Sequence, residues 1–505
     1  MIFRRLTAFL CLLSFLALAA CRKDDIYVTP ESFDPGSEEV RPDDGNDDDH
    51  GGGDEDGPVD FKVIYPSTCG ISYMYNNGNI LPEVHIEVSL DEWNKLLDYY
   101  DENRNTTKSV LCDVRYLKGA EESVVKEAAL RLRGNTSRHR PEGSGGQHHT
   151  AGKTDWHRCH FQLNFHKYHK DDDHEIHGSR KVILKYFNGD AAYVREIYCY
   201  DLFRRAGVWT ASYSTYCRVF VHVEGDEKEA YYGVYSMIEP IDERFLKVRE
   251  SNFGSRDGYL WKCRYSASLN PSKGGSFGPD NEDGIEYVYE LKTHTEEFSK
   301  AEAVLKDFMK QLNSLSGKAF HDWIETVCDV PLLLRTYAVN VTVGMWDDYW
   351  NNSNNFYIYF SPASGGGYRF YFIPYDYDNT LGTSLACGVQ MDAGFQNPLR
   401  WGMESNPLIY KILQYDDYKQ IYIDELLRLV DPGYKLFWYE YSDERIRAWH
   451  DLISLYIKND TGEGSSIRDI PATWGNRSNY RILDSDSPNN FFVTKTKSIQ
   501  YYCGK

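Results

Sequence analysis

Four acidic residues and the asparagines beside them form the part of the sequence best suited to chemistry. Asp347 and Asp348 precede two predicted strands, and Asp376 and Asp378 follow them, all within residues 344–382. The strands FYIYF and YRFYFI are rich in aromatic and β-branched residues and predict a hairpin that brings both acidic ends together. Carboxylate and amide oxygens suit a hard cation such as Mg²⁺ and leave room for phosphate oxygens. The pattern favours phosphoryl transfer; the alternative is that Asp and Asn only begin and end strands, because they favour turns.

Three upstream blocks, together with the acidic segment, occur in an order that matches a known family. They are LRLRGNTS at 130–137, VILKYFNGDAAYVREIYCYDLFRRAG at 182–207 and YYGVYSMIEPIDERFL at 231–246. With WDDYWNNSNNFYIY and FIPYDYDNTLG, they resemble the spore-coat protein H (CotH) kinase family, atypical secreted kinases that phosphorylate proteins. The resemblance covers about residues 110–430. It implies an α+β, two-lobed atypical protein-kinase-like fold, with a β-rich N-lobe, a helical C-lobe and a C-terminal helical cap.

The resemblance also implies roles for the acidic segment. Asp347 would orient or deprotonate the acceptor hydroxyl, with Asp348 as the second candidate. Metal ions, Mg²⁺ or Mn²⁺, would be bound by Asp376, Asp378 and Asn354 or Asn355. The reaction expected is transfer of the ATP γ-phosphate to a Ser or Thr hydroxyl of a secreted or surface protein.

The nucleotide is expected at a turn that ends a predicted strand of the N-lobe. RLRGN places polar side chains at a loop mouth, where binding residues concentrate, and the resemblance puts this turn near the nucleotide; the Arg residues could instead be surface charge. A second contact is expected at the end of the strand before Pro240, which resembles the hinge between lobes. These candidates are Arg131, Arg133, Asn135, Ser137 and Glu239.

The cation for the phosphates is less clearly marked, because related kinases show a Lys-rich strand where this chain has RCHFQLNF at 158–165. Arg158, Lys181 or Lys185 must therefore supply it. Glu196, on a helix predicted over 190–207, is the candidate partner of that cation. The alternative is that Arg195 and Glu196 form an ordinary exposed pair.

A His-rich segment follows the RGNTS turn. Nine of the 15 histidines lie between residues 138 and 180. One hypothesis is a metal site, because Asp155, His157, Cys159 and His160 carry suitable donor atoms. The other is a polar insertion over the cleft, whose first half we expect to be mobile without ligand.

The amino terminus predicts an envelope lipoprotein. Arg4-Arg5, the apolar LTAFLCLLSFLAL and Leu18-Ala19-Ala20-Cys21 form a lipoprotein signal, so Cys21 would be acylated and would anchor the chain. An incidental Cys after a simple signal peptide is the alternative. The CRKDD start resembles surface-export signals of Gram-negative lipoproteins, so we expect the protein at the outer membrane, facing either the periplasm or the outside.

The organisation of the chain follows from its composition. Residues 22–60 hold 15 acidic and 3 basic residues, a self-repelling tether that carries −12 of the net charge of −20. Basic residues form no stripe, so a nucleic-acid partner is not expected. Nine cysteines after Cys21 are widely spread, which predicts mostly buried thiols and one or two bridges at most. The predicted parts are 1–20 signal peptide, 21–60 tether, 61–110 N-terminal α/β segment of the N-lobe, 111–430 CotH kinase-like domain and 431–505 C-terminal helical extension.

Two other functions stay open at this point. The first is a non-catalytic adhesin or glycan-binding lipoprotein on the same fold, since aromatic residues of the C-terminal helices could stack on sugars; aromatic residues at helical spacing are also typical of a core. The second is a metal-binding protein centred on the His-rich segment.

Overall fold

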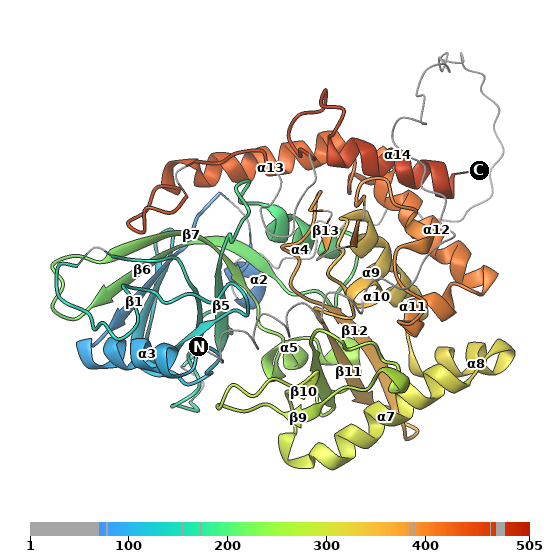
Figure 1. The fold of residues 1–505 in the computed structure, drawn as a ribbon, viewed down its shortest axis with the longest axis horizontal. Helices are drawn as coiled ribbons and strands as arrows, with labels where there is room; N and C mark the ends of the chain where they lie inside the picture. Colours follow the sequence, from blue (N-terminus) through green and yellow to red (C-terminus); the bar gives the residue numbers. More distant parts are fainter. Residues whose placement is uncertain are drawn as a thin grey trace, which may run out of the picture. The chain divides into compact units, whose positions relative to one another are not determined.

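The first half of the described chain forms a closed β-barrel (Figure 1). The computed structural model describes residues 70–76, 79–153, 155–171, 174–383, 385–386, 389–390, 392–464, 466–470 and 480–504. The strand order around the barrel is β1-β2-β3-β4-β5-β7-β6, and β1 closes it by pairing with β6 in parallel. The strands are β1 Glu83–Val88, β2 Val110–Lys118, β3 Glu121–Arg133, β4 His160–Asn164, β5 Lys181–Tyr186, β6 Ser214–Val223 and β7 Ala230–Ile238.

Alternation of apolar residues fills the barrel. In β2, Val110, Cys112, Val114 and Tyr116 are buried, while the residues between them are half-buried or exposed, as expected of strands with one face in a core. Helix α3 (Leu90–Glu102) packs Trp93 and Leu97 into the same core. The predicted cap is confirmed, because the Ser89 side chain accepts a hydrogen bond from the backbone N–H of Glu92. The short helix α2 (Gly70–Met74) contributes Ile71 and Met74.

A second sheet carries the acidic segment and has the strand order β12-β11-β8-β10-β9. The predicted hairpin is confirmed: β11 (Phe356–Pro362) pairs antiparallel with β12 (Tyr368–Pro374). Strands β8 (Tyr259–Cys263), β9 (Phe277–Pro279) and β10 (Tyr289–Leu291) extend the sheet and have no counterpart in the sequence predictions. A small two-stranded sheet follows, β13 (Leu385–Ala386) with β14 (Val389–Gln390).

Helices make up most of the rest of the chain. They are α4 Arg195–Arg205, α5 Glu243–Val248, α6 Glu250–Phe253, α7 Phe298–Ser314, α8 Gly317–Val327, α9 Val330–Thr342, α10 Tyr349–Asn352, α11 Pro407–Ile412, α12 Asp416–Val430, α13 Tyr439–Ile453 and α14 Phe491–Cys503. Short turns lie at 271–273, 295–297, 398–400, 432–434 and 454–456. The architecture is therefore mixed α+β, with alternating strand patterns first and helical patterns later, as predicted.

The apolar segment between residue 321 and Asp347 is not one continuous helix. The chain breaks between α8 and α9, where the Asp329 side chain accepts from the Leu332 N–H and Pro331 lies in the first turn of α9. A capping Asp followed by Pro is a helix-start signal. Helix α9 then ends at Thr342, and Gly344, at φ 70°, turns the chain toward the acidic residues.

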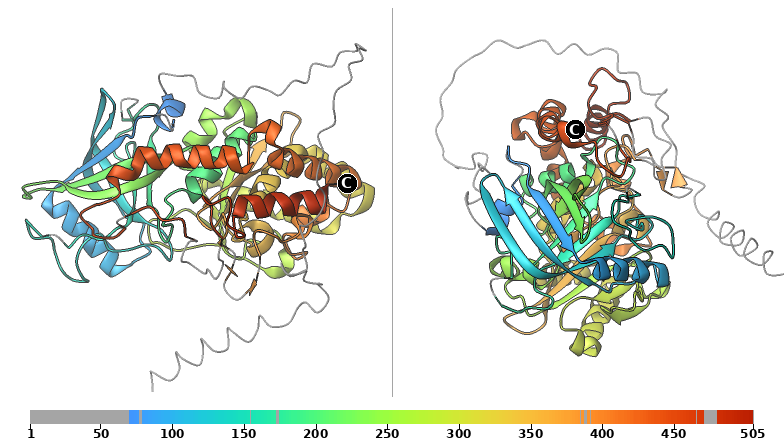
Figure 2. Two further views of the ribbon diagram at one scale, coloured as in Figure 1. Left: turned by 90° about the horizontal axis from the view of Figure 1, so that it is seen from above. Right: turned by 90° about the vertical axis from the view of Figure 1, so that its left-hand side faces the viewer.

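The C-terminal helices contact both the barrel and the helical part (Figures 1 and 2). Tyr198 of α4 and Ser442 of α13 share a hydrogen bond of 2.7 Å. Beyond α13, the Tyr456 carbonyl accepts from the hydroxyl of Tyr231 on β7. These contacts join α4 and the barrel through one segment, and the described residues form one compact unit.

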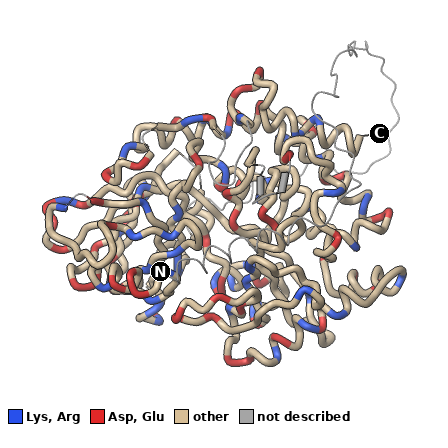
Figure 3. Tube along the Cα trace, in the orientation of Figure 1, with Lys and Arg blue, Asp and Glu red and all other residues tan. Residues whose placement is uncertain are grey.

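The cysteines are buried, and residues of opposite charge are mixed along the chain. The described thiols at 112, 159, 199, 217, 263, 328 and 503 are all buried and unbridged, which confirms the prediction of buried thiols; Cys69 and Cys387 lie outside the described residues. Basic and acidic residues are interspersed along the chain (Figure 3). Among the described helices, we find no stretch with the length and hydropathy needed to cross a bilayer. The predicted signal, Cys21 and the tether lie outside the described residues.

Candidate functional site

Lys185 lies at the centre of a cluster of three carboxylates. Its Nζ is 2.9 Å from Glu196 Oε2, 2.5 Å from Asp376 Oδ1 and 3.2 Å from Asp378 Oδ2. The Lys185 side chain is only 13% exposed and that of Glu196 is 6%, whereas those of the two aspartates are about one-third exposed. The cluster thus joins barrel strand β5, helix α4 and the end of the β11–β12 hairpin.

Local structure explains why Glu196 reaches Lys185. In β5, Leu184 and Tyr186 point into the barrel core, so Lys185 points out of it. Helix α4 starts at Arg195 because the buried Asp190 carboxylate accepts the backbone N–H groups that precede and open the helix. Glu196 is therefore held in the first helical turn.

The turn after β12 presents Asp376. This residue has φ 65°, a left-handed conformation that is uncommon outside glycine and is concentrated at functional sites. Its backbone N–H donates to the hydroxyl of Tyr200 on α4 at 3.2 Å. The turn is thereby fixed to the same helix that carries Glu196.

The three acids of the cluster differ in pKa. Burial opposes ionisation of every member, but Asp376, Asp378 and Glu196 together hold the pKa of Lys185 well above its ordinary value. Lys185 in turn outweighs burial at Asp376 and lowers its pKa. Burial raises the pKa of Glu196 to about 7 and that of Asp378 to about 6. Asp376 is therefore the carboxylate that stays ionised over the widest pH range.

Asp347 lies in a ring of asparagine amides. Its carboxylate accepts from Asn352 Nδ2 at 2.5 Å, Asn354 Nδ2 at 3.0 Å and Asn355 Nδ2 at 2.9 Å. Burial raises the pKa of Asp347 to about 6, and the negative charges of Asp376 and Asp378 add to the effect. The hairpin therefore brings the two acidic ends into electrostatic contact, as its pattern predicted.

Asp348 has a structural position instead. Its side chain caps α10, accepting from the Asn351 N–H at 2.7 Å, and also accepts from Asn340 Nδ2 at 2.6 Å. It is 3% exposed, and burial raises its pKa to about 8. Asp347 also has partners for both carboxylate oxygens, but they are side-chain amides, and the charges of Asp376 and Asp378 act on it. Asp348 instead holds α10 and Asn340 in place.

Arg133, at the end of β3, reaches the acidic turn. It donates a hydrogen bond of 2.7 Å to the hydroxyl of Tyr375, which precedes Asp376. Arg131 donates to Gln162 on β4 at 2.7 Å. Ser137 is 3.0 Å from His160 Nε2, and Asn135 is exposed. Of these candidates, the structure brings Arg133 toward the cluster.

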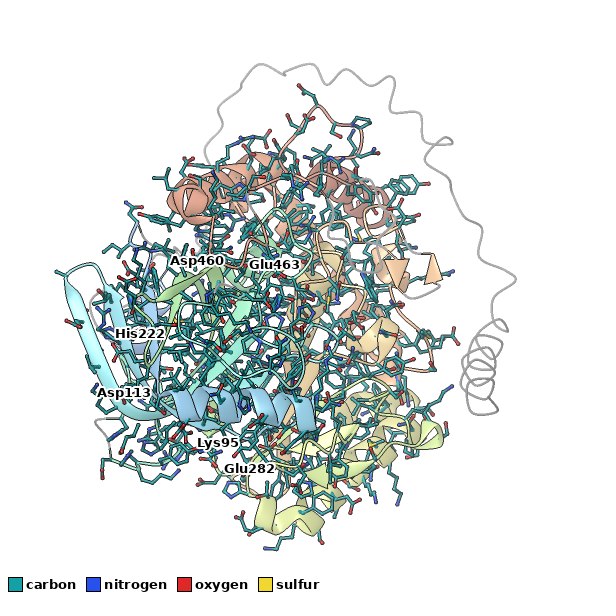
Figure 4. The ribbon with its side chains drawn as sticks, turned by 60° about the vertical axis from the view of Figure 1, so that its left-hand side comes forward. Lys95, Asp113, His222, Glu282, Asp460 and Glu463 are labelled. Carbon is teal, nitrogen blue, oxygen red and sulfur yellow. The ribbon has the colours of Figure 1, made fainter. Side chains whose placement is uncertain are left out.

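Three other predicted residues are engaged elsewhere. Arg158 pairs with Glu463 at 3.2 Å, and Lys181 pairs with Asp242 at 2.8 Å, so neither lies among the acids. The Glu239 carboxylate is held by Arg249 through two hydrogen bonds of 2.7 and 2.8 Å and is 4% exposed. Glu463, labelled in Figure 4, belongs to the segment after α13. In this structure these side chains are held by partners distant in sequence, and their roles in nucleotide binding stay predictions.

The His-rich segment is packed, not suspended over the cleft. Arg140 pairs with Asp101 of α3 at 3.0 Å. The buried Glu142 carboxylate accepts from the indole N–H of Trp93, also on α3, at 2.8 Å and lies 2.9 Å from His149. The segment therefore covers α3, contrary to the prediction of a mobile flap. The side chains of Arg140, Glu142 and His149 can be buried because each has a hydrogen-bonding or charged partner.

Among the described residues of that segment, no group of three or more His, Cys, Asp or Glu side chains surrounds a common metal position, so the metal hypothesis gains no support here. Cys159 is buried, and burial raises its pKa well above the ordinary value. His160 stacks on Tyr186, and burial lowers its pKa well below the ordinary value.

Sequence reasoning missed Lys262, on β8, and Arg264, directly after that strand. The available signal was a pair of basic residues two positions apart at the end of a short apolar run. Elsewhere, a largely apolar cavity of about 580 Å³ lies between α7 and the 271–277 segment, and none of the predicted site residues lines it.

Among the described residues, the Lys185 cluster likewise holds no group of three or more His, Cys, Asp or Glu side chains around a common metal position; the residues there that could hold a divalent cation are the two aspartates. Asp376 and Asp378 offer two partly exposed carboxylates from one turn, which is the small oxygen set that Mg²⁺ uses when phosphate oxygens and water complete its shell. Asn354 and Asn355 direct their amide nitrogens to Asp347, so their oxygens remain for other partners.

Comparison with known proteins agrees with this geometry. The family model described as CotH kinase protein matches residues 130–482, more than half of the chain. The match includes Lys185, Glu196, Asp347, Asp376 and Asp378. A search of curated proteins found no match. On the family match, the chain belongs to the CotH kinase protein family.

Proposed function

We propose that this protein is a Ser/Thr protein kinase that uses ATP with Mg²⁺ or Mn²⁺. The observation that carries the proposal is the contact of Lys185 with Glu196 and Asp376. Protein kinases place a strand Lys against a helix Glu and hold metal with an Asp at the opposite side of the cleft. On this proposal, the barrel with α4 is the N-lobe, and the hairpin sheet with the later helices is the C-lobe.

Asp347 is the proposed base. Its ionised carboxylate would accept the proton of the acceptor hydroxyl while the hydroxyl oxygen bonds to the γ-phosphorus. The bond from that phosphorus to the β,γ-bridging oxygen breaks, and ADP leaves with the electron pair. The amides of Asn352, Asn354 and Asn355 orient the carboxylate, which lowers the cost of reaching a productive geometry.

Lys185 is the proposed phosphate-binding cation. Glu196 fixes its ammonium group, and the raised pKa keeps that group charged. A divalent metal, when bound by Asp376 and Asp378, supplies positive charge to the phosphates. Without nucleotide, Lys185 balances these carboxylates; with nucleotide, phosphate oxygens and metal would replace part of its contacts.

The adhesin hypothesis remains the alternative. Of the aromatic residues in the C-terminal helices, Tyr418, Tyr422 and Trp449 are buried and not open to sugar stacking, whereas Tyr501 is 57% exposed. The lack of a Lys-rich strand at 158–165 is explained, because Lys185 on the next strand meets the acids.

The proposed location is the cell envelope, because Leu18-Ala19-Ala20-Cys21 has the form of a lipoprotein signal. We propose that Cys21 is acylated and anchors the protein in the outer membrane, with a secreted or surface protein as substrate. Labelling of cells with a fatty-acid analogue should mark the parent protein and not Cys21→Ser. Equal labelling of both would exclude this anchor.

Calorimetry tests the proposed function. The purified protein should bind ATP in the presence of Mg²⁺, and Asp376→Asn should weaken that binding while leaving the thermal unfolding profile intact. Absence of metal-dependent nucleotide binding by the folded parent would refute the kinase proposal.

A further inference from the structure

Lys262, in the middle of β8, is a half-buried cation with no anionic partner. Among the described residues, no ion pair or hydrogen bond of its ammonium group is found. Its Nζ lies 5.3 Å from the centre of the Tyr375 ring. Burial, the Arg264 charge and other nearby cations lower its pKa well below the ordinary value. A half-buried lysine normally has a counter-ion, so this position points to an anion that binds there.

The neighbouring acid cannot serve as that counter-ion, because it is already paired. Glu290 lies opposite Lys262 in the β8–β10 register, but it accepts from Arg264 and from Lys292, each at 2.9 Å. Burial opposes its ionisation, yet the Lys292 and Arg264 charges outweigh burial and lower the pKa of Glu290 to about 2. Lys292 has a further partner, Asp280, at 2.7 Å. Arg264 also pairs with Glu286 at 3.1 Å. Among the described residues, Lys262 is therefore left without a carboxylate in ion-pair contact, although Glu290 acts on it electrostatically.

Tyr375 connects Lys262 to the acids. Its ring lies below the Lys262 ammonium, its hydroxyl accepts from Arg133, and the next residue is Asp376. Lys262 and Arg133 therefore both contact Tyr375, beside the turn that carries Asp376, from two other strands, β8 and β3.

We propose that Lys262 and Arg133 form a second anion subsite that holds the terminal phosphate of the bound nucleotide, separate from the contact made by Lys185. This rests on the proposed kinase function and assigns a residue that the family signature blocks quoted above do not include. A phosphate monoester on a protein acceptor has the same chemistry, so the test separates the two sources. A phosphate bound between Lys262 and Arg133 explains why a lysine without a carboxylate contact is kept at this position.

The experiment compares Lys262→Met with the parent by calorimetry, using ATP, ADP and AMP with Mg²⁺. Affinity for ATP should fall roughly tenfold or more, as for loss of a charge-assisted contact, while ADP and AMP binding stay unchanged. Lys126→Met is the control: it removes an exposed lysine of β3 that pairs with Asp113, and it should leave the ATP preference intact. Lys262→Arg should also retain it.

A second measurement separates binding from a structural role. Because Met removes an unpaired charge and leaves no orphaned partner, Lys262→Met should unfold at the same or a higher temperature than the parent. A lower unfolding temperature, an equal loss for ADP, or unchanged ATP binding would each overturn the assignment. The assignment would also be overturned if Lys262→Met weakened the binding of a phosphoserine peptide but not of ATP. The subsite would then hold the phosphate of the acceptor. If the parent itself binds no nucleotide, the proposed function fails first.

Discussion

Replacing Lys185 by Met should destabilise the protein by an amount that depends on pH. The ammonium group is within 3.2 Å of three carboxylates, of which Glu196 is the most buried. Removing one partner of a buried ion pair costs about 3–5 kcal/mol. Asp376 and Asp378 add less, because solvent screens groups that are one-third exposed. We therefore expect a loss of about 3–5 kcal/mol at pH near 8.

Lowering the pH should recover most of that loss. Burial already raises the pKa of Glu196 to about 7 and that of Asp378 to about 6, and without the ammonium the folded variant should bind about one more proton than the folded parent. A carboxyl pKa raised by folding stabilises the folded state at low pH, and this contribution is lost as pH rises through the folded pKa. One proton changes the free energy of unfolding by about 1.4 kcal/mol per pH unit, so about 3 kcal/mol returns between roughly pH 8 and pH 5.5.

Urea denaturation of the parent, Lys185→Met and Lys181→Met at both pH values measures these quantities. Lys181 lies on the same strand but has a single partner, Asp242, and is one-third exposed. Its loss should cost about 0–1 kcal/mol with little pH dependence. An equal loss for Lys185→Met at both pH values, or one no larger than for Lys181→Met, would refute the reasoning.

The other predictions concern single residues around the cluster. Asp347→Asn should slow phosphoryl transfer by about 10²–10⁴-fold, as for loss of a general base, with unchanged ATP affinity by calorimetry; weakened ATP binding would argue for a metal ligand instead. In the parent, the rate should rise as pH increases through about 6, because burial raises the pKa of Asp347 to about 6 and only the ionised carboxylate accepts a proton; a flat profile would exclude Asp347 as the base. Asp348→Ala should lower the free energy of unfolding by about 2 kcal/mol, since it removes a helix cap and a buried hydrogen bond, and urea denaturation would show no change if the carboxylate were dispensable. Arg158→Ala should leave ATP affinity unchanged, because Arg158 pairs with Glu463; a clear loss by calorimetry would return it to the phosphate site.

Much of this fold follows from local patterns. The 81–88 strand, the Ser89 cap and the β11–β12 hairpin were predictable because period-two alternation and capping chemistry act within a few residues. The break between α8 and α9 was also marked by Asp329 and Pro331. Closure of the barrel by parallel pairing of β1 with β6 was not predictable, because it joins strands more than 100 residues apart.

In the candidate site, too, local features were predictable from the sequence and long-range contacts were not. The two acidic ends were predictable because the hairpin between them is short. Choosing Lys185 over Arg158 and Lys181 required the structure, since each choice depends on a carboxylate from a distant segment. The capping role of Asp348 depends partly on Asn340 of the preceding helix. The unpaired Lys262 is visible only when the partners of Glu290 are known.

The most direct test of the account is transfer of label from γ-labelled ATP to protein. The purified chain, incubated with Mg²⁺ or Mn²⁺ and an extract of envelope proteins, should place labelled phosphate on Ser or Thr side chains, identified by mass spectrometry. Chelation of the metal, Asp347→Asn and Asp376→Asn should each abolish the label while the variants remain folded. Label that persists in the Asp347→Asn and Asp376→Asn variants, or a folded parent that transfers none with either metal, would contradict the account.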